Sequence, residues 1–136
     1  MDLPAEARRR IESDAVAWLT TVTDSGAPAP NPVWFVPDGN DLIVFSAPSS
    51  RKVHNIKQRP QVCLHFNSDA TGGDIVIING LADLTSGQKP SAQPGYLTKY
   101  EAAITGELDT TVEAIDAEFN TRIRITPTRV RLTPTA

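Results

Sequence analysis

The segment from residue 42 to residue 66, LIVFSAPSSRKVHNIKQRPQVCLHF, constrains the fold of this chain more than any other part. Leu42–Phe45 is a compact apolar run, and apolar residues alternate with others over Val62–Phe66, so both flanks are predicted to be strands. A short helix is expected between them, with Ser49 or Ser50 as its N-terminal cap. A helix this short between two strands favours a compact β structure.

Two cations follow the predicted helix cap at once. Arg51 and Lys52 occupy the first turn, where the positive end of the helix dipole favours acidic residues. Free backbone N–H groups, serine hydroxyls and two cations together form a site that suits an anion, most naturally a phosphate. The alternative is a solvated basic helix without a ligand.

The preceding part of the chain is predicted to form a hairpin. Residues 15–23 are rich in strand formers, and residues 24–26, Asp-Ser-Gly, supply a turn. The next segment has prolines at positions 28, 30, 32 and 37, so an irregular or edge strand centred on residues 33–36 is expected. Its unpaired backbone is suited to face a planar ligand, and Trp34 is either part of that surface or a core aromatic residue.

The second half of the chain adds two strands and two helices to the prediction. A long strand is expected over residues 75–84 and a closing strand over residues 121–132. Between them, Tyr96, Leu97, Tyr100 and Ile104 share one helical face, Gly106 ends that helix, and Asp109 is the expected cap of a second one. About six strands with short helices favour a mainly β antiparallel barrel, formed by a single domain of residues 1–136.

Composition narrows the possible partners and the location. The formal net charge is -3 and the pI is about 5.3, which disfavours nucleic-acid binding through bulk charge. The chain has one cysteine, no apolar stretch long enough to cross a membrane and no apolar signal core near its start. A cytoplasmic protein without membrane or nucleic-acid partners is therefore expected.

Familiar catalytic motifs are missing from the sequence. There is no GxSxG, HExxH or paired CxxC motif, and the acidic residues have no metal-ligand spacing. His54 is expected on an exposed helix position, and Cys63 and His65, which share one strand face, are expected to pack rather than to react. An anion site without catalytic side chains suggests that a bound phosphorylated cofactor performs the chemistry.

The segment FSAPSSRKVHNIKQRPQVCLHF resembles the FMN-phosphate segment of the pyridoxamine 5'-phosphate oxidase-like split barrels. The segments WLTTVTDSGAPAPNPVWFVPDGNDLIVFS and GGDIVIINGLADL resemble the neighbouring barrel strands of that family. The resemblance implies a six-stranded antiparallel split β-barrel, the FMN-binding split barrel. It also implies a homodimer with the cofactor in a groove at the dimer interface.

The resemblance also implies which residues bind the cofactor. The phosphate would be held at Ser46, Ser50, Arg51 and Lys52, and Ala47 is also expected to bind the cofactor. The ring system would be lined, largely by backbone, at Asn31, Pro32, Val33 and Trp34. No side chain is assigned a catalytic role and no metal site is expected, so the proton would come from solvent.

Two departures from the oxidase itself change the expected activity. Its second-strand arginine and lysine correspond to Pro30 and Phe35, and its C-terminal substrate motif has no counterpart in TRIRITPTRVRLTPTA. The NPVWF and RVRL segments instead resemble the actinobacterial branch that uses the deazaflavin coenzyme F420. This branch implies an F420-dependent oxidoreductase that passes hydride to a small conjugated substrate. The alternatives are an FMN-dependent oxidoreductase and a non-catalytic protein that binds a flavin, F420 or haem.

Overall fold

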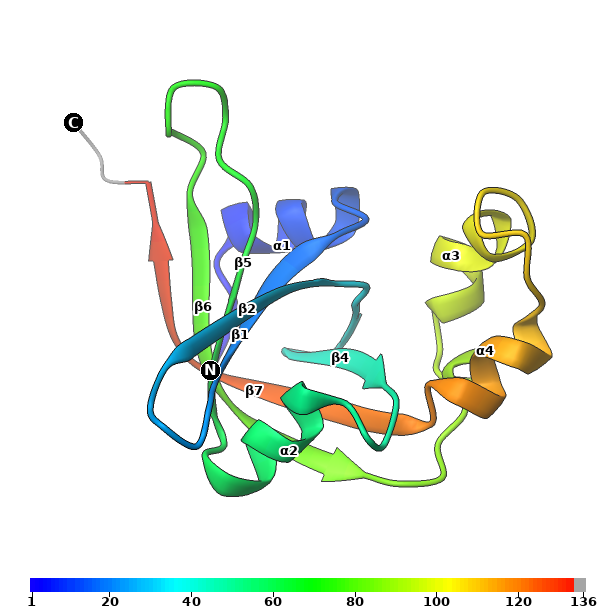
Figure 1. Cartoon of the computed structure of the whole chain (residues 1–136). Helices are drawn as coiled ribbons and strands as arrows, with labels where there is room; N and C mark the ends of the chain where they lie inside the picture. The colour runs from blue at the N-terminus through cyan, green and yellow to red at the C-terminus, as the bar shows by residue number, and fades with distance from the viewer. Residues whose placement is uncertain (134–136) are drawn as a thin grey trace.

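The computed structural model describes residues 1–133 and shows a mainly β protein with short helices (Figure 1). The strands are β1 (Ala17–Val22), β2 (Pro28–Val33), β3 (Val36–Asp38), β4 (Asp41–Ser46), β5 (Gln61–His65), β6 (Val76–Thr85) and β7 (Thr121–Leu132). The helices are α1 (Ala5–Ser13), α2 (Arg51–Gln58), α3 (Tyr96–Thr105) and α4 (Val112–Glu118), with a short 3-10 helix η1 (Pro90–Ala92) before α3. Among residues 1–133, no helix is both long and apolar enough to span a membrane.

All seven strands belong to one antiparallel sheet with the order β2-β1-β5-β6-β7-β4-β3. β2 and β3 therefore lie at opposite ends of the sheet, although only Trp34 and Phe35 separate them in the chain. The sheet must curl until its two ends nearly meet. Within the described strands no ladder joins β2 to β3, so the barrel is split rather than closed by hydrogen bonds.

The prediction of six strands was wrong by one, because the proline-rich segment forms two strands on opposite edges of the sheet. The chain leaves the ladder at Phe35, which was expected near the centre of a single strand. The Phe35 N–H donates to the Tyr100 hydroxyl at 2.9 Å, and the Phe35 carbonyl accepts from Lys99 Nζ at 3.0 Å. Side chains of α3 thus satisfy the backbone groups that a continuous strand would have paired.

The barrel interior is filled by alternate residues of the strands. The core contains Leu19, Phe35, Leu42, Val44, Leu64, Ile78, Ile123 and Ile125, and α1 closes it with Ala7 and Ile11. The predicted helix α2 packs through Val53 and Ile56, while the buried Asn55 amide donates to Thr21 of β1 at 3.0 Å. These contacts hold the first turn of α2 at a defined place beside β1.

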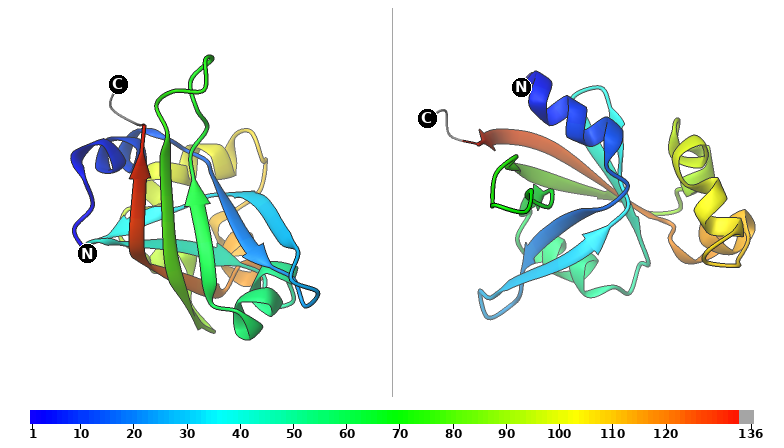
Figure 2. Two further views of the ribbon diagram at one scale, coloured as in Figure 1. Left: turned by 90° about the vertical axis from the view of Figure 1, so that its left-hand side faces the viewer. Right: turned by 90° about the horizontal axis from the view of Figure 1, so that it is seen from above.

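Helices α3 and α4 lie together on one side of the barrel, as the view from above shows (Figure 2). The predicted face of α3 is confirmed, because Tyr96, Tyr100 and Ile104 are buried against Val36 and Ile43. The expected cap of α4 was wrong: Thr111 accepts the Ala114 N–H. Asp109 instead occupies the preceding turn with a positive φ of 48°.

The arginine run in α1 divides into exposed and buried members. Arg8 and Arg9 are exposed, as expected for a solvated face, but Arg10 is only 6% exposed. Its guanidinium bonds the Asp14 carboxylate at 2.7 Å, the Asp74 carboxylate at 3.1 Å and the Asn67 carbonyl at 2.7 Å. Arg10 therefore ties α1 to the loop between β5 and β6.

The closing strand β7 continues past Pro127 as one strand, but the interruption expected near Pro127 is present as a β-bulge. Asn79 of β6 pairs with Arg129 and Gly80 pairs with Pro127, so Thr128 is an extra residue in β7. A Cβ atom on Gly80 would lie 2.7 Å from the Thr126 carbonyl oxygen. Glycine is required there because the two backbones approach too closely for a side chain.

Candidate cofactor-binding site

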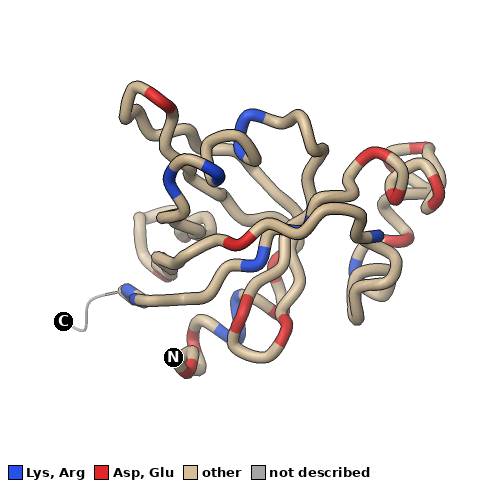
Figure 3. Tube along the Cα trace, turned by 90° about the horizontal axis from the view of Figure 1, so that it is seen from below, with Lys and Arg blue, Asp and Glu red and all other residues tan. Residues whose placement is uncertain are grey.

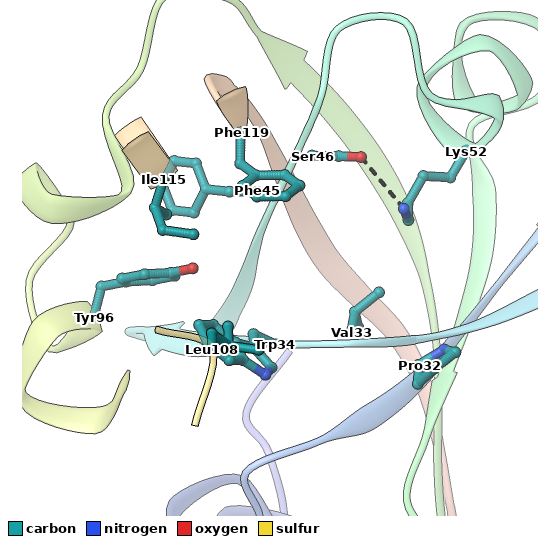
Figure 4. Close-up of a pocket in the computed structure, with 10 residues that line it drawn as sticks. All are labelled: Pro32, Val33, Trp34, Phe45, Ser46, Lys52, Tyr96, Leu108, Ile115 and Phe119. Carbon is teal, nitrogen blue, oxygen red and sulfur yellow. Dashed lines mark hydrogen bonds between the residues drawn. The ribbon is translucent and has the colours of Figure 1, made fainter. Parts of the chain in front are cut away.

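A pocket of about 220 Å³ lies in the split of the barrel (Figure 4). β3 pairs with β4 only up to Ile43, so Phe45 and Ser46 of β4 have no β3 neighbour. β2 is the edge strand on the other side of the split, and every second residue of β2 directs its backbone N–H and C=O groups away from β1. The pocket is lined by Pro32, Val33, Trp34, Phe45, Ser46, Lys52, Tyr96, Leu108, Ile115 and Phe119.

One end of the pocket carries a chain of hydrogen bonds that joins β4 to α2. Lys52 Nζ donates to the Ser46 hydroxyl at 3.3 Å, and Ser46 donates to the Ser50 hydroxyl at 2.8 Å. Ser50 is the predicted N-cap and accepts the Val53 N–H at 3.3 Å. Two of the predicted serines and the predicted lysine are therefore held together in a fixed arrangement.

Lys52 is a partly buried cation without a carboxylate partner among residues 1–133. Burial lowers the pKa of its ammonium group, because desolvation disfavours the charged form. The Ser46 hydroxyl is its hydrogen-bond partner in the described structure and carries no charge. The site is therefore electrostatically incomplete and suited to an anion.

The first turn of α2 adds further donors to this end of the pocket. Within residues 1–133, the N–H groups of Arg51 and Lys52 have no hydrogen-bond partner, and the first turn contains no acidic residue. Arg51 is exposed beside them. Six of the sixteen acidic residues lie over residues 101–118, on the α3–α4 side of the molecule (Figure 3), and Asp24, which pairs with His54, is an acidic residue near Arg51. A phosphate group fits the donors at the start of α2.

The other end of the pocket is aromatic. Trp34 stacks on Tyr100 with ring centroids 4.3 Å apart, and Phe45 meets Tyr96 edge to face at 5.5 Å. Phe119, at the end of α4, completes this wall. Flat rings pack well on such surfaces. A ligand with an anionic group and a planar ring would match both ends.

The predicted site residues fall into two groups in the structure. Pro32, Val33, Trp34, Ser46 and Lys52 line the pocket. The other four do not line it: Asn31 is exposed on the edge strand, Ala47 accepts the Ser50 N–H through its carbonyl, Ser50 accepts from Ser46, and Arg51 is exposed at the start of α2. Cofactor contact by any of these residues stays a prediction.

Sequence reasoning missed half of the pocket. The missed residues are Phe45, Tyr96, Leu108, Ile115 and Phe119. Four of them come from α3, α4 and their connections, which were expected only to pack on the barrel. The single sequence signal was the apolar face of the two helices, and that pattern does not distinguish a core contact from a pocket wall.

Other candidate reactive groups lie outside the pocket. His54 pairs with the Asp24 carboxylate at 3.0 Å across the β1–β2 turn, and its side chain is 44% exposed. Burial raises the pKa of the Cys63 thiol, so it is not an activated thiolate. Among residues 1–133, no three His, Cys, Asp or Glu side chains converge as metal ligands do.

The barrel is split beside β4. One end of the split has a helix start and a lysine without a carboxylate partner among residues 1–133, and the other end has aromatic rings, so these features define a split-barrel protein suited to an anionic ring ligand. The comparison with known families agrees. The model of the family described as pyridoxamine 5'-phosphate oxidase matches residues 3–134, and the chain belongs to this family. The predicted family is thereby confirmed.

Solved structures share the fold at low sequence identity. An F420 reductase superposes with a TM-score of 0.77 at 22% identity, covering 95% of this chain and 98% of its own. A haem storage protein from Vibrio cholerae has a TM-score of 0.66 at 16% identity, covering 98% and 96%. An FAD-binding protein from Mesorhizobium loti has a TM-score of 0.60 at 17% identity, covering 94% and 90%. A search of curated proteins found no match.

Proposed function

We propose that the protein is an F420-dependent oxidoreductase that passes hydride from the reduced coenzyme to a small conjugated substrate. The observation that carries the proposal is Lys52, a partly buried cation without a carboxylate partner among residues 1–133, beside free N–H groups and an aromatic pocket. The likeness to an F420 reductase over 95% of the chain supports it. When bound, the reduced deazaflavin would supply the hydride.

The positions of Pro30 and Phe35 favour F420 over FMN. Phe35 is completely buried in the barrel core, and Pro30 is exposed on the edge strand opposite Thr20. Neither residue supplies the cations that the oxidase uses for FMN. The anion-binding donors are therefore concentrated at the start of α2, where Lys52 and Arg51 would hold the phosphate of F420 and its acidic tail.

The residues of this chain would bind and orient rather than transfer protons. Ser46 and Ser50 hold Lys52 in place, and the edge of β2 offers backbone donors and acceptors along the split. Trp34, Phe45 and Phe119 exclude water from the aromatic end of the pocket, where the substrate would meet the cofactor ring. Positioning two reactants in a dry site is a sufficient contribution to hydride transfer.

A second copy of the chain would complete the site. The pocket of about 220 Å³ is below the roughly 300–1,000 Å³ typical of sites that enclose a whole ligand. The outer face of the barrel presents Trp18, Ile77 and Leu81, and Leu81 is 45% exposed. Apolar side chains gathered on an outer sheet face suit a contact between copies, so a homodimer follows from the proposal.

The central test is a titration of the purified protein with F420 and, separately, with FMN. The wild type is expected to bind F420 with micromolar or better affinity and FMN more weakly. Lys52→Ala should weaken F420 binding roughly tenfold or more, because a charge-assisted hydrogen bond is lost. Lys57→Ala is the matched control, since Lys57 is exposed in the last turn of the same helix.

The alternatives give different outcomes in the same titration. Freshly purified protein that is yellow and holds FMN would favour an FMN-dependent oxidoreductase. Bound cofactor that never turns over with quinones, nitroaromatics or tetrapyrroles would favour a carrier or storage protein. Haem is the least suited ligand, because neither histidine lines the pocket. Absence of both F420 and FMN binding would contradict the proposal.

The dimer has its own test. Sedimentation velocity should give twice the chain mass of 14.7 kDa. Leu81→Glu should shift the protein toward the monomer and weaken F420 binding at the same time. Tight F420 binding by a monomer would contradict a site shared between copies.

A further inference from the structure

Tyr96 places a hydroxyl group inside the aromatic end of the pocket. The residue is 4% exposed and begins α3, immediately after Gly95. Figure 4 shows its hydroxyl directed into the pocket, between Phe45 and Ile115 on one side and Leu108 and Trp34 on the other. The ring itself is fixed by Phe45 at 5.5 Å and by Tyr100 at 5.2 Å. The hydroxyl is therefore held in one position.

This hydroxyl has no hydrogen-bond partner among residues 1–133. The neighbouring Tyr100 hydroxyl provides the contrast, because it bonds the Phe35 backbone and lies 2.7 Å from the Ala15 carbonyl. Among residues 1–133, the fully buried side-chain atoms without a partner are Asn55 Oδ1 and Arg122 Nε, so the Tyr96 oxygen lies at the pocket surface, where a small molecule can reach it. A donor held at the surface of an apolar pocket, without a partner in the protein, is available to an acceptor atom of a ligand.

The hydroxyl acts as a donor near neutral pH. Burial, together with the neighbouring Asp116 carboxylate, raises the pKa of Tyr96 to about 12. Asp116 is itself engaged by the Ser91 N–H at 2.9 Å, so it does not take the tyrosine proton. The indole N–H of Trp34 belongs to a partly exposed side chain that water can reach. Tyr96, at 4% exposed, is thus the more enclosed of the two donors at this end of the pocket.

The residues around the Tyr96 hydroxyl determine which kind of chemical group can accept its hydrogen bond. Around the Tyr96 hydroxyl the walls are Trp34, Phe45, Ile115 and Phe119, none of which is charged. A carboxylate there would lose its hydration without a compensating cation, whereas a carbonyl oxygen needs only one donor. The aromatic end is one part of a pocket of about 220 Å³, and an apolar cavity of about 150 Å³ is enough for benzene, so this end suits a molecule of one or two small rings.

We propose that the Tyr96 hydroxyl recognises the neutral acceptor oxygen of a flat, apolar one- or two-ring substrate bound between Trp34, Phe45 and Phe119. The inference rests on the proposed function in one respect, because it leaves the Lys52 end of the pocket and the edge of β2 to the cofactor and its ring, and gives the aromatic end to the substrate. It adds to that function a substrate class, uncharged cyclic carbonyl compounds, and a residue that selects it.

The test uses two probes that differ by one oxygen. Indanone is a flat bicyclic ketone, and indane is the same ring system without the carbonyl group. Dissociation constants for both are measured by NMR titration on the wild type and on Tyr96→Phe, first with the free protein and then with F420 added. The Phe variant keeps the ring and loses no internal hydrogen bond, so it should fold as the wild type does.

The expected result is a change confined to the ketone. Tyr96→Phe should weaken indanone binding roughly three- to tenfold, as one neutral hydrogen bond implies, and leave indane within about twofold. Equal effects on both probes, no effect on either, or no binding of either probe to the wild type would overturn the inference. If Tyr96→Phe weakens only indanone binding and the wild type does not bind F420, the result would support recognition by Tyr96 and contradict the proposed cofactor.

Discussion

Trp34 and Tyr100 stack face to face, with ring centroids 4.3 Å apart and ring planes 1° from parallel. Trp34 belongs to the two-residue link between β2 and β3, and Tyr100 lies in α3. The stack therefore joins the split of the barrel to the helices that form the far wall of the pocket. The stability of this junction decides whether the pocket keeps its shape.

The Tyr100 hydroxyl should contribute measurably to stability. Tyr100→Phe leaves the buried Phe35 N–H without a partner, at a cost of about 1–3 kcal/mol in the free energy of unfolding. Urea denaturation measures this cost. Tyr96→Phe is the matched control, expected to change stability by less than about 0.5 kcal/mol because its hydroxyl bonds nothing among residues 1–133. Equal losses in the two variants would contradict the described hydrogen bonds.

Lys52 should lower the free energy of unfolding of the protein without cofactor, although it contributes to F420 binding. Lys52→Met removes a partly buried cation without a carboxylate partner among residues 1–133 and keeps most of the side-chain volume. The free energy of unfolding is expected to stay equal or rise by about 1 kcal/mol, while F420 affinity falls. Thermal denaturation without cofactor provides the measurement. A variant that loses stability would show that Lys52 has a structural role instead.

Lys99 should make stability depend on pH in the alkaline range. Burial lowers the pKa of Lys99 to about 8 from an ordinary value of 10.5, and Asp14 opposes the shift. Between these two values the unfolded chain binds a proton that the folded chain has lost, so the free energy of unfolding rises with pH. Burial raises the pKa of Tyr96 and of Tyr100, so stability falls again above about 10.

The rise between pH 8 and pH 10 should therefore be clearly smaller in Lys99→Met, and the part that remains comes from Lys52, whose pKa burial also lowers. Denaturant unfolding at a series of pH values measures it. Lys57→Met, which changes an exposed lysine on α2, should keep the rise. A wild-type protein whose stability falls steadily from pH 8 upward would contradict the burial of Lys99 against Phe35.

Arg10 should be the one member of its arginine run that matters for folding. Arg10→Met removes the buried donor that joins the Asp14 and Asp74 carboxylates and the Asn67 carbonyl, at a cost of about 2–3 kcal/mol, although Asp74 keeps Arg9 and Asp14 keeps the Ser13 hydroxyl. Arg9→Met changes a side chain that is 56% exposed and should cost less than about 0.5 kcal/mol. Similar losses in both variants, measured by urea denaturation, would disprove the distinction.

The strands and the anion end of the pocket were predictable because they depend on neighbours in sequence. Ser50 caps α2 through Val53, three residues away, and Ser46 and Lys52 lie within six residues of each other. The alternation of apolar with other residues predicted β5 and the first half of β7 correctly. Turn residues after Val22 placed the β1–β2 hairpin. These are short-range effects of backbone geometry, capping and periodicity.

The aromatic end of the pocket was decided by tertiary structure. The strand break at Phe35 depends on Lys99 and Tyr100, which are 64 and 65 residues away in the chain. Tyr96 meets Phe45 across a similar separation. Local preference extends over a few residues, so it predicted one continuous strand and two covering helices. Only the packing of those helices on the barrel showed that the strand divides and that Tyr96 faces a ligand pocket rather than the core.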